Sequence, residues 1–317
     1  MDPLTHALAG ATLAWAATGS RLGRRSLAIG AAAALLPDID VLIRSAADPL
    51  LAIEHHRGFT HSLLFVPIGG AVAALPFARR GQRWWAVLAG VLAYASHALL
   101  DSATTYGTRL FWPFSRQRVG LDVISIIDPL FTAIVLIGTI AAFAARRRIA
   151  IVALAFAVAW LAGGFVQRER ASAAQARLAS TRGHRLERGA VFPTIGNTLV
   201  WRSLYRTGGT LHIDRIRVPW FGGATYAAVT AVPLVSGSGR DFERFAWFSD
   251  GWVARAPDDP TVIGDARYSL LADAYDPVWG IRLAPTEWVN RTRRREVALA
   301  PLWAEIRGQD PAFRPLP

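Results

Sequence analysis

The sequence predicts an α-helical polytopic membrane domain of about five or six helices, followed by a small, mainly β extramembrane domain. Three observations support this fold class. Six apolar segments precede residue 167, the loops between them alternate in charge, and apolar and polar residues alternate beyond residue 188. We therefore predict a transmembrane helical domain over 1–166, a helical linker over 167–188 and a mainly β domain over 189–317.

The composition excludes several classes of protein. Of the 317 residues, 52% are apolar, and the net charge is +12, with arginine supplying all the positive charge. Residues 1–166 carry 14 Arg and 8 acids, and residues 167–317 carry 21 Arg and 15 acids, so no basic arm indicates nucleic-acid binding. Cysteine is absent, which excludes disulfides and thiolate metal sites. The first residues contain no basic region, so we expect no cleavable signal peptide.

The apolar segments differ in how well they could cross a bilayer. A helix needs about 20 residues for this, with a usual range of about 17–25. The last two segments are long enough, the middle ones are marginal, and whether the first spans the membrane stays open. The segments cover residues 4–18, 26–43, 62–78, 84–100, 123–145 and 149–166.

The charges of the connecting loops predict an orientation. Three short loops, at 21–25, 79–83 and 146–148, contain nine Arg and no acid. All eight acids of this half lie in the other connections or at the starting end. Because arginine-rich loops stay in the cytoplasm, we expect the acidic loops and the C-terminal domain to lie outside, which is the periplasm in a bacterium with two membranes.

The C-terminal domain is predicted from alternating residues and turn signals. Residues 198–206 and 210–218 flank Thr-Gly-Gly and predict a β-hairpin. Residues 244–256 predict a second hairpin, and residues 167–188, rich in Arg, Ala and Glu, predict a helix that continues from the membrane domain.

Histidines and aspartates gather on the predicted outer side of the membrane domain. The arginine counts alone set this orientation, so the agreement is independent of them. Asp128, expected one to two turns into the fifth segment, either supports a ligand or pairs with an arginine. His55 is the weakest member of the set, because adjacent residues rarely share a site. The candidate metal ligands are His6, Asp38, Asp40, His56, His61, His97 and Asp101.

The spacing of these residues suits metal binding. His97 and Asp101 lie four residues apart and so share one helical face, whereas Asp38 and Asp40 follow Pro37 in a turn. Imidazole and carboxylate without thiolate favour Zn²⁺, with Mn²⁺ or Fe²⁺ as alternatives. More than four candidate ligands indicate more than one site, and we expect one to three ions. Thr60 and Ser62 are expected to orient ligands.

Catalytic roles follow from the same residues. Paired ions can hold a phosphate and activate water for in-line attack. Arg57 is expected to bind the anion through parallel hydrogen bonds, and Asp40 or Asp101 to act as general base.

With these motifs in hand, the chain resembles the membrane-bound metal-dependent hydrolases, the YdjM-like inner-membrane proteins. The matching pieces are MDPLTHALAG, LLPDID, HHRGFTHS and SHALLDSATTYGT, with FSDGW and DARYS in the tail. The resemblance covers residues 1–130 well and the tail more loosely. It implies a multi-pass inner-membrane protein with a metal-dependent hydrolase activity, and it carries the metal role onto the seven residues named above.

The leading hypothesis is a hydrolase in which water activated by metal attacks a phosphoester or another ester of a lipid-linked or otherwise anionic substrate at the membrane surface. One alternative is a transporter or metal-handling protein, which would favour polar groups near the middle of the bilayer. Another is a non-catalytic scaffold whose β domain binds a partner. The sequence leaves the oligomeric state undefined.

Overall fold

The computed structural model describes residues 1–269, 274–292 and 299–316. The chain divides into two compact units. The first, called the helical unit here, comprises Met1–Ile43 and His55–Gly164. The second, called the β unit, comprises Arg44–Glu54 and Phe165–Pro317. The short segment Arg44–Glu54 therefore lies in a different unit from the residues on both sides of it.

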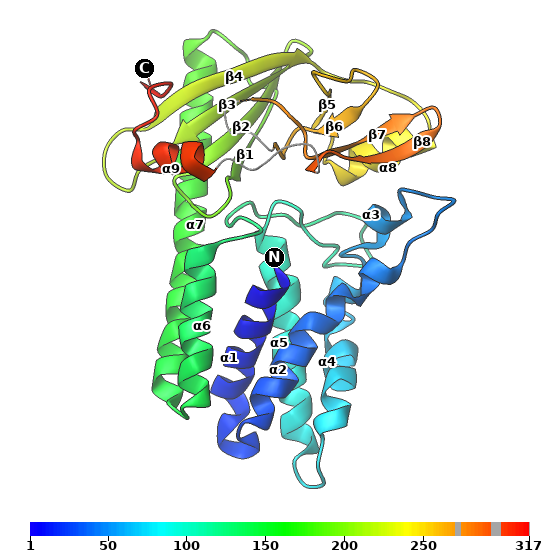
Figure 1. The fold of residues 1–317 in the computed structure, drawn as a ribbon, viewed down its shortest axis with the longest axis vertical. Coiled ribbons are helices and arrows are strands. Elements are labelled where there is room, and N and C mark those ends of the chain that lie inside the picture. The colour runs from blue at the N-terminus through cyan, green and yellow to red at the C-terminus, as the bar shows by residue number, and fades with distance from the viewer. Residues whose placement is uncertain (270–273, 293–298, 317) are drawn as a thin grey trace. The chain divides into compact units, whose positions relative to one another are not determined.

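The helical unit is built from α-helices joined by short 3-10 helices (Figure 1). The last helix, α7, continues from this unit into the β unit. The elements are α1 Pro3–Leu22, α2 Arg25–Leu35, η1 Leu36–Leu42, α3 Leu51–His55, η2 Phe59–His61, α4 Val66–Ala74, η3 Leu75–Phe77, α5 Arg83–Ala103, α6 Pro129–Phe143 and α7 Arg147–Thr181.

Small residues allow these helices to pack closely. A Cβ atom added at Gly30 would lie 2.4 Å from the carbonyl oxygen of Gly10, so α1 and α2 meet backbone to backbone. In the same way, a Cβ at Gly90 would lie 2.1 Å from the carbonyl oxygen of Gly70, where α4 meets α5. Such close approach is the usual packing of helices in lipid, where small residues let backbones make extensive van der Waals contact.

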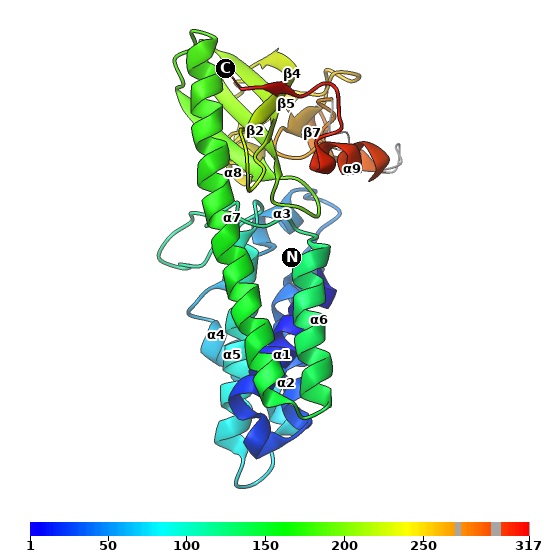
Figure 2. The same ribbon diagram turned by 90° about the vertical axis from the view of Figure 1, so that its left-hand side faces the viewer.

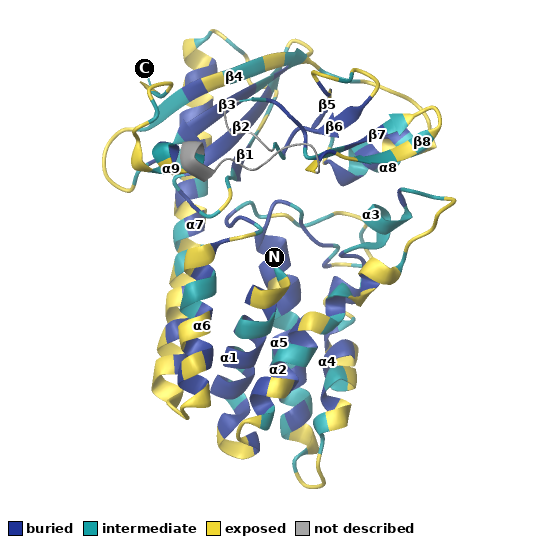
Figure 3. Ribbon diagram, viewed as in Figure 1, coloured by how far each residue is buried: buried dark blue, intermediate teal, exposed yellow. Residues whose placement is uncertain are grey.

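Among the described residues, two helices, α5 and α7, are long and apolar enough to cross a membrane. A third span is formed if the bent pair 51–61 and 66–77, which meets at 80°, counts as one. The prediction of five or six membrane helices is therefore not supported. The remaining apolar segments fold into pieces that are too short, such as α6 with 15 residues, or that do not pass the same test, such as α1. Many residues of α6 and α7 are exposed (Figure 3). They include the apolar residues Ile140 and Phe156.

The fifth apolar segment begins its helix later than predicted. Asp128 is the N-cap of α6, and its carboxylate accepts hydrogen bonds from the backbone N–H groups of Leu130 and Phe131 at 3.1 and 2.9 Å. Its other oxygen accepts from Nε1 of Trp160 at 3.1 Å. The expectation that Asp128 lies inside the helix and supports a ligand or pairs with an arginine is wrong, because the carboxylate caps the helix.

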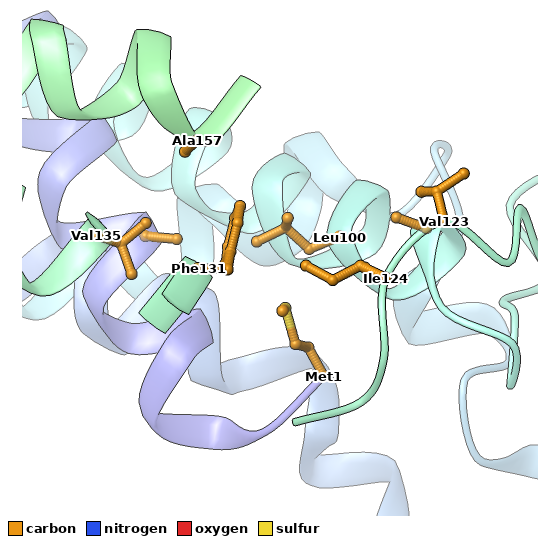
Figure 4. Packing of buried hydrophobic residues seen from close by; sticks show 9 residues of the cluster. Met1, Leu100, Val123, Ile124, Phe131, Val135 and Ala157 are labelled. Carbon is orange, nitrogen blue, oxygen red and sulfur yellow. The ribbon is translucent and has the colours of Figure 1, made fainter. Parts of the chain in front are cut away.

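The connection between α5 and α6 packs onto the helices through an apolar cluster. Val123 and Ile124 from this connection pack with Leu100 of α5 and Phe131 of α6, and the side chain of Met1 completes the contact (Figure 4). Leu100 directly precedes Asp101, so this cluster fixes the end of α5 that carries the predicted ligand pair.

The β unit contains two antiparallel sheets. The first has the strand order β1-β2-β3-β4-β9 and the second β5-β6-β7-β8. The predicted hairpin is confirmed, since β2 pairs with β3 in register from Val200↔Arg217 to Thr207↔Thr210. The strands are β1 Arg188–Pro193, β2 Val200–Thr207, β3 Thr210–Arg217, β4 Thr225–Pro233, β5 Val253–Arg255, β6 Ile263–Asp265, β7 Trp279–Leu283, β8 Thr286–Asn290 and β9 Arg314–Pro315, with helices α8 Arg240–Phe248 and α9 Leu299–Arg307.

The second predicted hairpin is wrong. Residues 240–248 form the helix α8 instead of a strand, and only Val253–Arg255 is extended. Phe242, Phe245 and Phe248 recur at every third position and are all buried, which is the helical period.

The C-terminal part of α7 packs on the first sheet (Figure 2). Nε2 of Gln175 donates hydrogen bonds to the carbonyl oxygens of Ala190 and Leu204 at 2.9 and 3.0 Å. These hydrogen bonds attach the side chain of Gln175 to the backbone of β1 and β2.

Candidate metal centre

The predicted ligands come from separate elements that meet at one end of the helical unit. Asp38 and Asp40 lie in η1, which continues α2, and His97 and Asp101 lie in the last two turns of α5. His56 and His61 lie between α3 and α4, and His6 is in the first turn and a half of α1. Figure 1 shows the N-terminus and the end of α5 at the same end of the helices.

One group of four residues has the geometry of a metal site. It consists of Asp38, His61, His97 and Asp101, each offering one ligand atom within 4.8 Å of the others. Nε2 of His61 lies 3.0 Å from Nε2 of His97. Both nitrogens lie 3.5 Å from Oδ1 of Asp38, and 3.4 and 3.3 Å from Oδ2 of Asp101. Tetrahedral zinc with bonds of about 2.0–2.1 Å separates its ligand atoms by about 3.3 Å.

Hydrogen bonds on the far side of each imidazole select the tautomer that can bind a metal. Nδ1 of His97 donates to the carbonyl oxygen of Ala34 at 2.5 Å, which leaves Nε2 as the lone-pair nitrogen. Nδ1 of His61 lies 3.0 Å from the hydroxyl of Thr60, which itself donates to Oδ2 of Asp40. The second nitrogen of each ring therefore faces a hydrogen-bond acceptor, as in metal sites. Two lone pairs then face each other at 3.0 Å, which a cation between them would stabilise.

A second group shares one member with the first. Asp38, Asp40 and His56 also offer ligand atoms within 4.8 Å of one another. Oδ1 of Asp40 lies 2.7 Å from Nδ1 of His56. Because Asp38 belongs to both groups, its carboxylate would be available to a metal ion held by either one.

Asp40 is fixed by a dense set of donors. Its Oδ2 accepts hydrogen bonds from the backbone N–H of Arg57 at 2.9 Å and from the hydroxyl of Thr60 at 2.7 Å. Burial raises the pKa of Asp40, but hydrogen bonds from His56 and His61 outweigh it, and the pKa lies well below its ordinary value. Asp40 is therefore a carboxylate, the form that binds cations.

His6 lies at the site without belonging to either group. Its ring stacks on that of His97 with centroids 3.7 Å apart, and its Nε2 lies 3.1 Å from Oδ1 of Asp101. The amino group of Met1 donates to the same oxygen. His6 is fully buried, and its Nδ1 has no hydrogen-bond partner among the described residues. The contacts place His6 as a support of His97 and Asp101.

Arg57 is occupied by the protein itself. Its Nε lies 3.0 Å from Oδ2 of Asp101, and its Nη1 donates to the hydroxyl of Thr104 at 3.0 Å. The guanidinium also lies over the ring of Tyr106, 4.7 Å from the centroid. The side chain is 6% exposed. These contacts make Arg57 a positioning residue for Asp101, and its role toward a substrate stays a prediction.

The structure adds contributors that the sequence did not indicate. The carbonyl of Ala34 orients His97, but a backbone oxygen leaves no signal in a sequence. The hydroxyl of Tyr94 donates to the carbonyl of Thr60 at 2.7 Å and so holds the loop that carries His61. The hydroxyl of Thr104 accepts a hydrogen bond from Arg57. Thr104 belongs to the motif SHALLDSATTYGT, so its place in that motif was a sequence signal for this role. His55 belongs to neither ligand group.

The donor set fits a divalent transition metal. Nitrogen and oxygen donors without sulfur, in groups of four and three with one shared carboxylate, match Zn²⁺, Mn²⁺ or Fe²⁺ better than Ca²⁺, which prefers all-oxygen sites. Fold and site together define a class: a membrane protein with apolar helices, a C-terminal β unit and a His/Asp cluster capable of holding metal.

Comparison with known proteins gives the family. Residues 1–171 match the family described as YdjM inner membrane protein, and the chain belongs to this family. The predicted resemblance to YdjM-like proteins is thereby confirmed.

Three relatives illustrate the match. The chain is 39% identical over 100 residues to the inner membrane protein YbcI of Escherichia coli, covering 30% of this chain and 57% of the relative. It is 34% identical over 143 residues to the uncharacterized protein YfhP of Bacillus subtilis, covering 41% and 42%. It is 37% identical over 101 residues to the inner membrane protein YdjM of Escherichia coli, covering 28% and 50%. The chain thus spans about half the length of these relatives. No solved structure matches it.

Proposed function

We propose that this protein is a metal-dependent hydrolase of the bacterial inner membrane that cleaves a phosphoester or another ester of a lipid-linked substrate. The observation that supports it most is the pair of imidazole nitrogens, Nε2 of His61 and of His97, which face each other at 3.0 Å. Two carboxylates, from Asp38 and Asp101, complete the surroundings of this pair. Zinc is the first expectation for the metal, ahead of Mn²⁺ and Fe²⁺, with two neighbouring groups to hold ions.

Each residue has a defined task in this proposal. A bound divalent ion would act as a Lewis acid that polarises a phosphoryl or carbonyl oxygen and makes water a better nucleophile at neutral pH. His61 and His97 would be held in the binding tautomer by the hydroxyl of Thr60 and by the carbonyl of Ala34. Arg57 holds Asp101. The site thus keeps its ligand atoms in place before any ion binds, which reduces the reorganisation needed.

The contacts favour Asp38 as the general base. Asp40 and Asp101 are each 1% exposed, and both oxygens of Asp40 and Oδ1 of Asp101 lie within hydrogen-bond distance of other groups of the protein. Asp38 has a side chain that is 27% exposed, so a proton can pass from it to solvent. A base must reach both the attacking water and an exit for the proton, which the buried carboxylates lack.

The orientation of the site is part of the proposal. The arginine-rich loops at 21–25, 79–83 and 146–148 would lie in the cytoplasm under the positive-inside rule. The metal centre and the β unit would then face the periplasm, where lipid-linked precursors can be hydrolysed. A reporter fused after Pro317 tests this orientation separately from the chemistry.

Metal content is the first test. Elemental mass spectrometry of the full chain, purified in detergent, should show Zn, Mn or Fe in the parent and its loss in the His97→Ala/Asp101→Ala variant. The matched control is His184→Ala in the β unit, which removes an imidazole outside the cluster and should keep the metal. Absence of metal in the parent, even after reconstitution with each ion, would overturn the hydrolase proposal.

Turnover is the second test, and it separates the alternatives. A chromogenic phosphodiester and a lipid phosphoester in mixed micelles should both be hydrolysed by the parent, and Asp38→Asn should abolish hydrolysis. Metal without hydrolysis of any ester would favour a structural metal site in a membrane scaffold. Uptake of metal into vesicles by the reconstituted chain would favour a transporter.

A further inference from the structure

The connection between α5 and α6 carries an exposed aromatic segment. Residues 109–118 read RLFWPFSRQR and are called the aromatic loop here. Phe114 is 87% exposed and Phe111 is 53% exposed. Three arginines and no acid lie between Asp101 and Asp122. In Figure 2 part of this connection projects sideways from the helices.

The aromatic loop is attached directly to the segment that carries the metal ligands. Its base is closed by the bridge between Thr108 and Val119, with N–H to carbonyl distances of 3.0 and 2.7 Å. The backbone N–H of Arg109 donates to the carbonyl of Arg57 at 3.0 Å. Nη1 of Arg118 donates to the carbonyl of His56 at 3.3 Å. The loop and the ligand segment therefore form one connected piece of backbone.

The apolar surface of the loop continues onto a helix face. The backbone N–H of Leu63 donates to the carbonyl of Leu110 at 2.9 Å, which places the entry of α4 beside the loop. From there a stripe of exposed apolar residues runs along one face at helical spacing. Its members and their exposed fractions are Leu64 50%, Ile68 52%, Val72 52% and Leu75 65%. This stripe belongs to the bent pair that is apolar enough to count as a membrane span.

A second group of exposed apolar residues lies on η1, another segment that supplies ligands. η1 exposes Ile39, Val41 and Leu42 at 54%, 50% and 66%, and these residues alternate with the ligands Asp38 and Asp40. Two of the segments that supply ligands are therefore bordered by exposed apolar side chains. A soluble site would expose polar groups at these positions.

We infer that the aromatic loop inserts Phe111 and Phe114 into the boundary between head groups and acyl chains of the bilayer, on the side of the metal centre. Exposed aromatic side chains favour this layer, because their rings lie among the acyl chains close to the head groups. The continuity with the stripe on α4 identifies the partner as the bilayer. Where the proposed function holds, the substrate is an amphiphile with an anionic head group that reaches the metal from the membrane surface.

Spin labelling tests the depth of the loop directly. The chain has no cysteine, so Phe114→Cys gives one labelling site in the full chain. Phe156→Cys on the exposed face of α7 serves as a reference within a candidate span, and Ser238→Cys on the β unit as a water-exposed control. The labelled chains are placed in nanodiscs of phosphatidylethanolamine and phosphatidylglycerol. For each spin label, the collision rate with oxygen, which is concentrated in the bilayer, is compared with the collision rate with a water-soluble nickel complex.

The expected result is a shift of the Phe114→Cys label toward oxygen access, as for Phe156→Cys, and away from the nickel access of Ser238→Cys. A Phe114→Cys label as open to nickel as the Ser238→Cys label would overturn the inference and favour a protein partner for the loop. This measurement requires no turnover, so it stands or fails independently of the proposed hydrolase activity.

Kinetics of a loop variant test the substrate class. Phe111→Ser/Phe114→Ser should lower hydrolysis of a phosphoester lipid held in vesicles by about tenfold or more, since the variant loses apolar area that can be buried. Hydrolysis of the soluble chromogenic phosphodiester should be unchanged. Equal loss on both substrates would overturn the assignment of an amphiphile. If the parent hydrolyses neither substrate and the label at position 114 lies in the bilayer, the result would count against the hydrolase proposal alone.

Discussion

Replacing Gly30 by alanine should loosen the metal centre from a distance. A Cβ at this position would lie 2.4 Å from the carbonyl oxygen of Gly10, 2.7 Å from Cβ of Ala14 and 2.8 Å from Cα of Ala11. Carbon atoms pack at about 3.5–4.0 Å, so α1 and α2 must separate by roughly 1 Å. Two of the three obstacles are backbone atoms, which cannot turn away as a side chain can.

The cost follows from two opposing effects. Overpacking costs about 1–3 kcal/mol, and alanine returns up to about 1 kcal/mol through its better helix propensity. We expect a net loss of about 1–2 kcal/mol and a fall in Tm of about 2–4 °C for each kcal/mol. Ala34 lies one turn further along α2 and accepts the hydrogen bond from Nδ1 of His97. Displacing it should weaken metal binding by about 10–100-fold, as is usual when a partner that orients a ligand is lost.

The assay combines thermal unfolding in detergent with titration of Zn²⁺ into the metal-free chain. Gly223→Ala is the matched control, because a Cβ there meets nothing within 4 Å and the residue is exposed. If Gly30→Ala keeps both the Tm and the zinc affinity of Gly223→Ala, the reasoning that α2 positions His97 is refuted.

Two further predictions concern the same centre, and a third concerns the segment Arg44–Glu54 of the β unit. His56→Ala should remove the ion of the group that contains Asp40 and leave the His61–His97 group loaded, as measured by metal stoichiometry; loss of all metal would contradict two separable groups. Chelation should lower Tm and zinc should restore it, with about 2.7 kcal/mol expected at zinc concentrations 100 times the Kd. Hydrogen bonds from Arg244 lower the pKa of Asp48 from 3.8, so the stability that this pair contributes is present above about pH 4 and is lost as the pH falls through the lowered pKa. Hydrogen exchange in Arg44–Glu54 should therefore rise below pH 4 in the parent, and at neutral pH in Arg244→Ala but not in Arg282→Ala, another arginine held by two acids of the β unit.

Much of the metal centre could be predicted because its residues lie at recognisable positions of regular elements. His97 and Asp101 share a helical face by spacing alone, and the charge of the loops places the other ligands at the same end. The structure brings Asp38, His61, His97 and Asp101 together, and joins Asp40 and His56 through Asp38.

The sequence does not decide between alternatives that are locally equally favourable, such as two partners for one side chain or a strand and a helix for one segment. The sequence does not show which carboxylate Arg57 lies beside, and in the structure its Nε lies 3.0 Å from Oδ2 of Asp101. Residues 244–248 alternate and also repeat at every third position, and burial of Phe245 and Phe248 decides for a helix. The sequence predicts too many membrane helices because the length of an apolar segment does not show where its helix breaks. One such break follows η2.

The segment Arg44–Glu54 shows how the β unit can matter to the metal centre without supplying a ligand. It begins shortly after Asp40 and ends two residues before His56, yet it belongs to the β unit. Arg244 of α8 holds it by donating to both oxygens of Asp48, at 3.0 and 2.9 Å, and to Glu54 at 3.0 Å. A bidentate pair with a second carboxylate fixes a loop more firmly than a single surface ion pair. These contacts reduce the conformational freedom of Arg44–Glu54, the stretch of chain between Asp40 and His56.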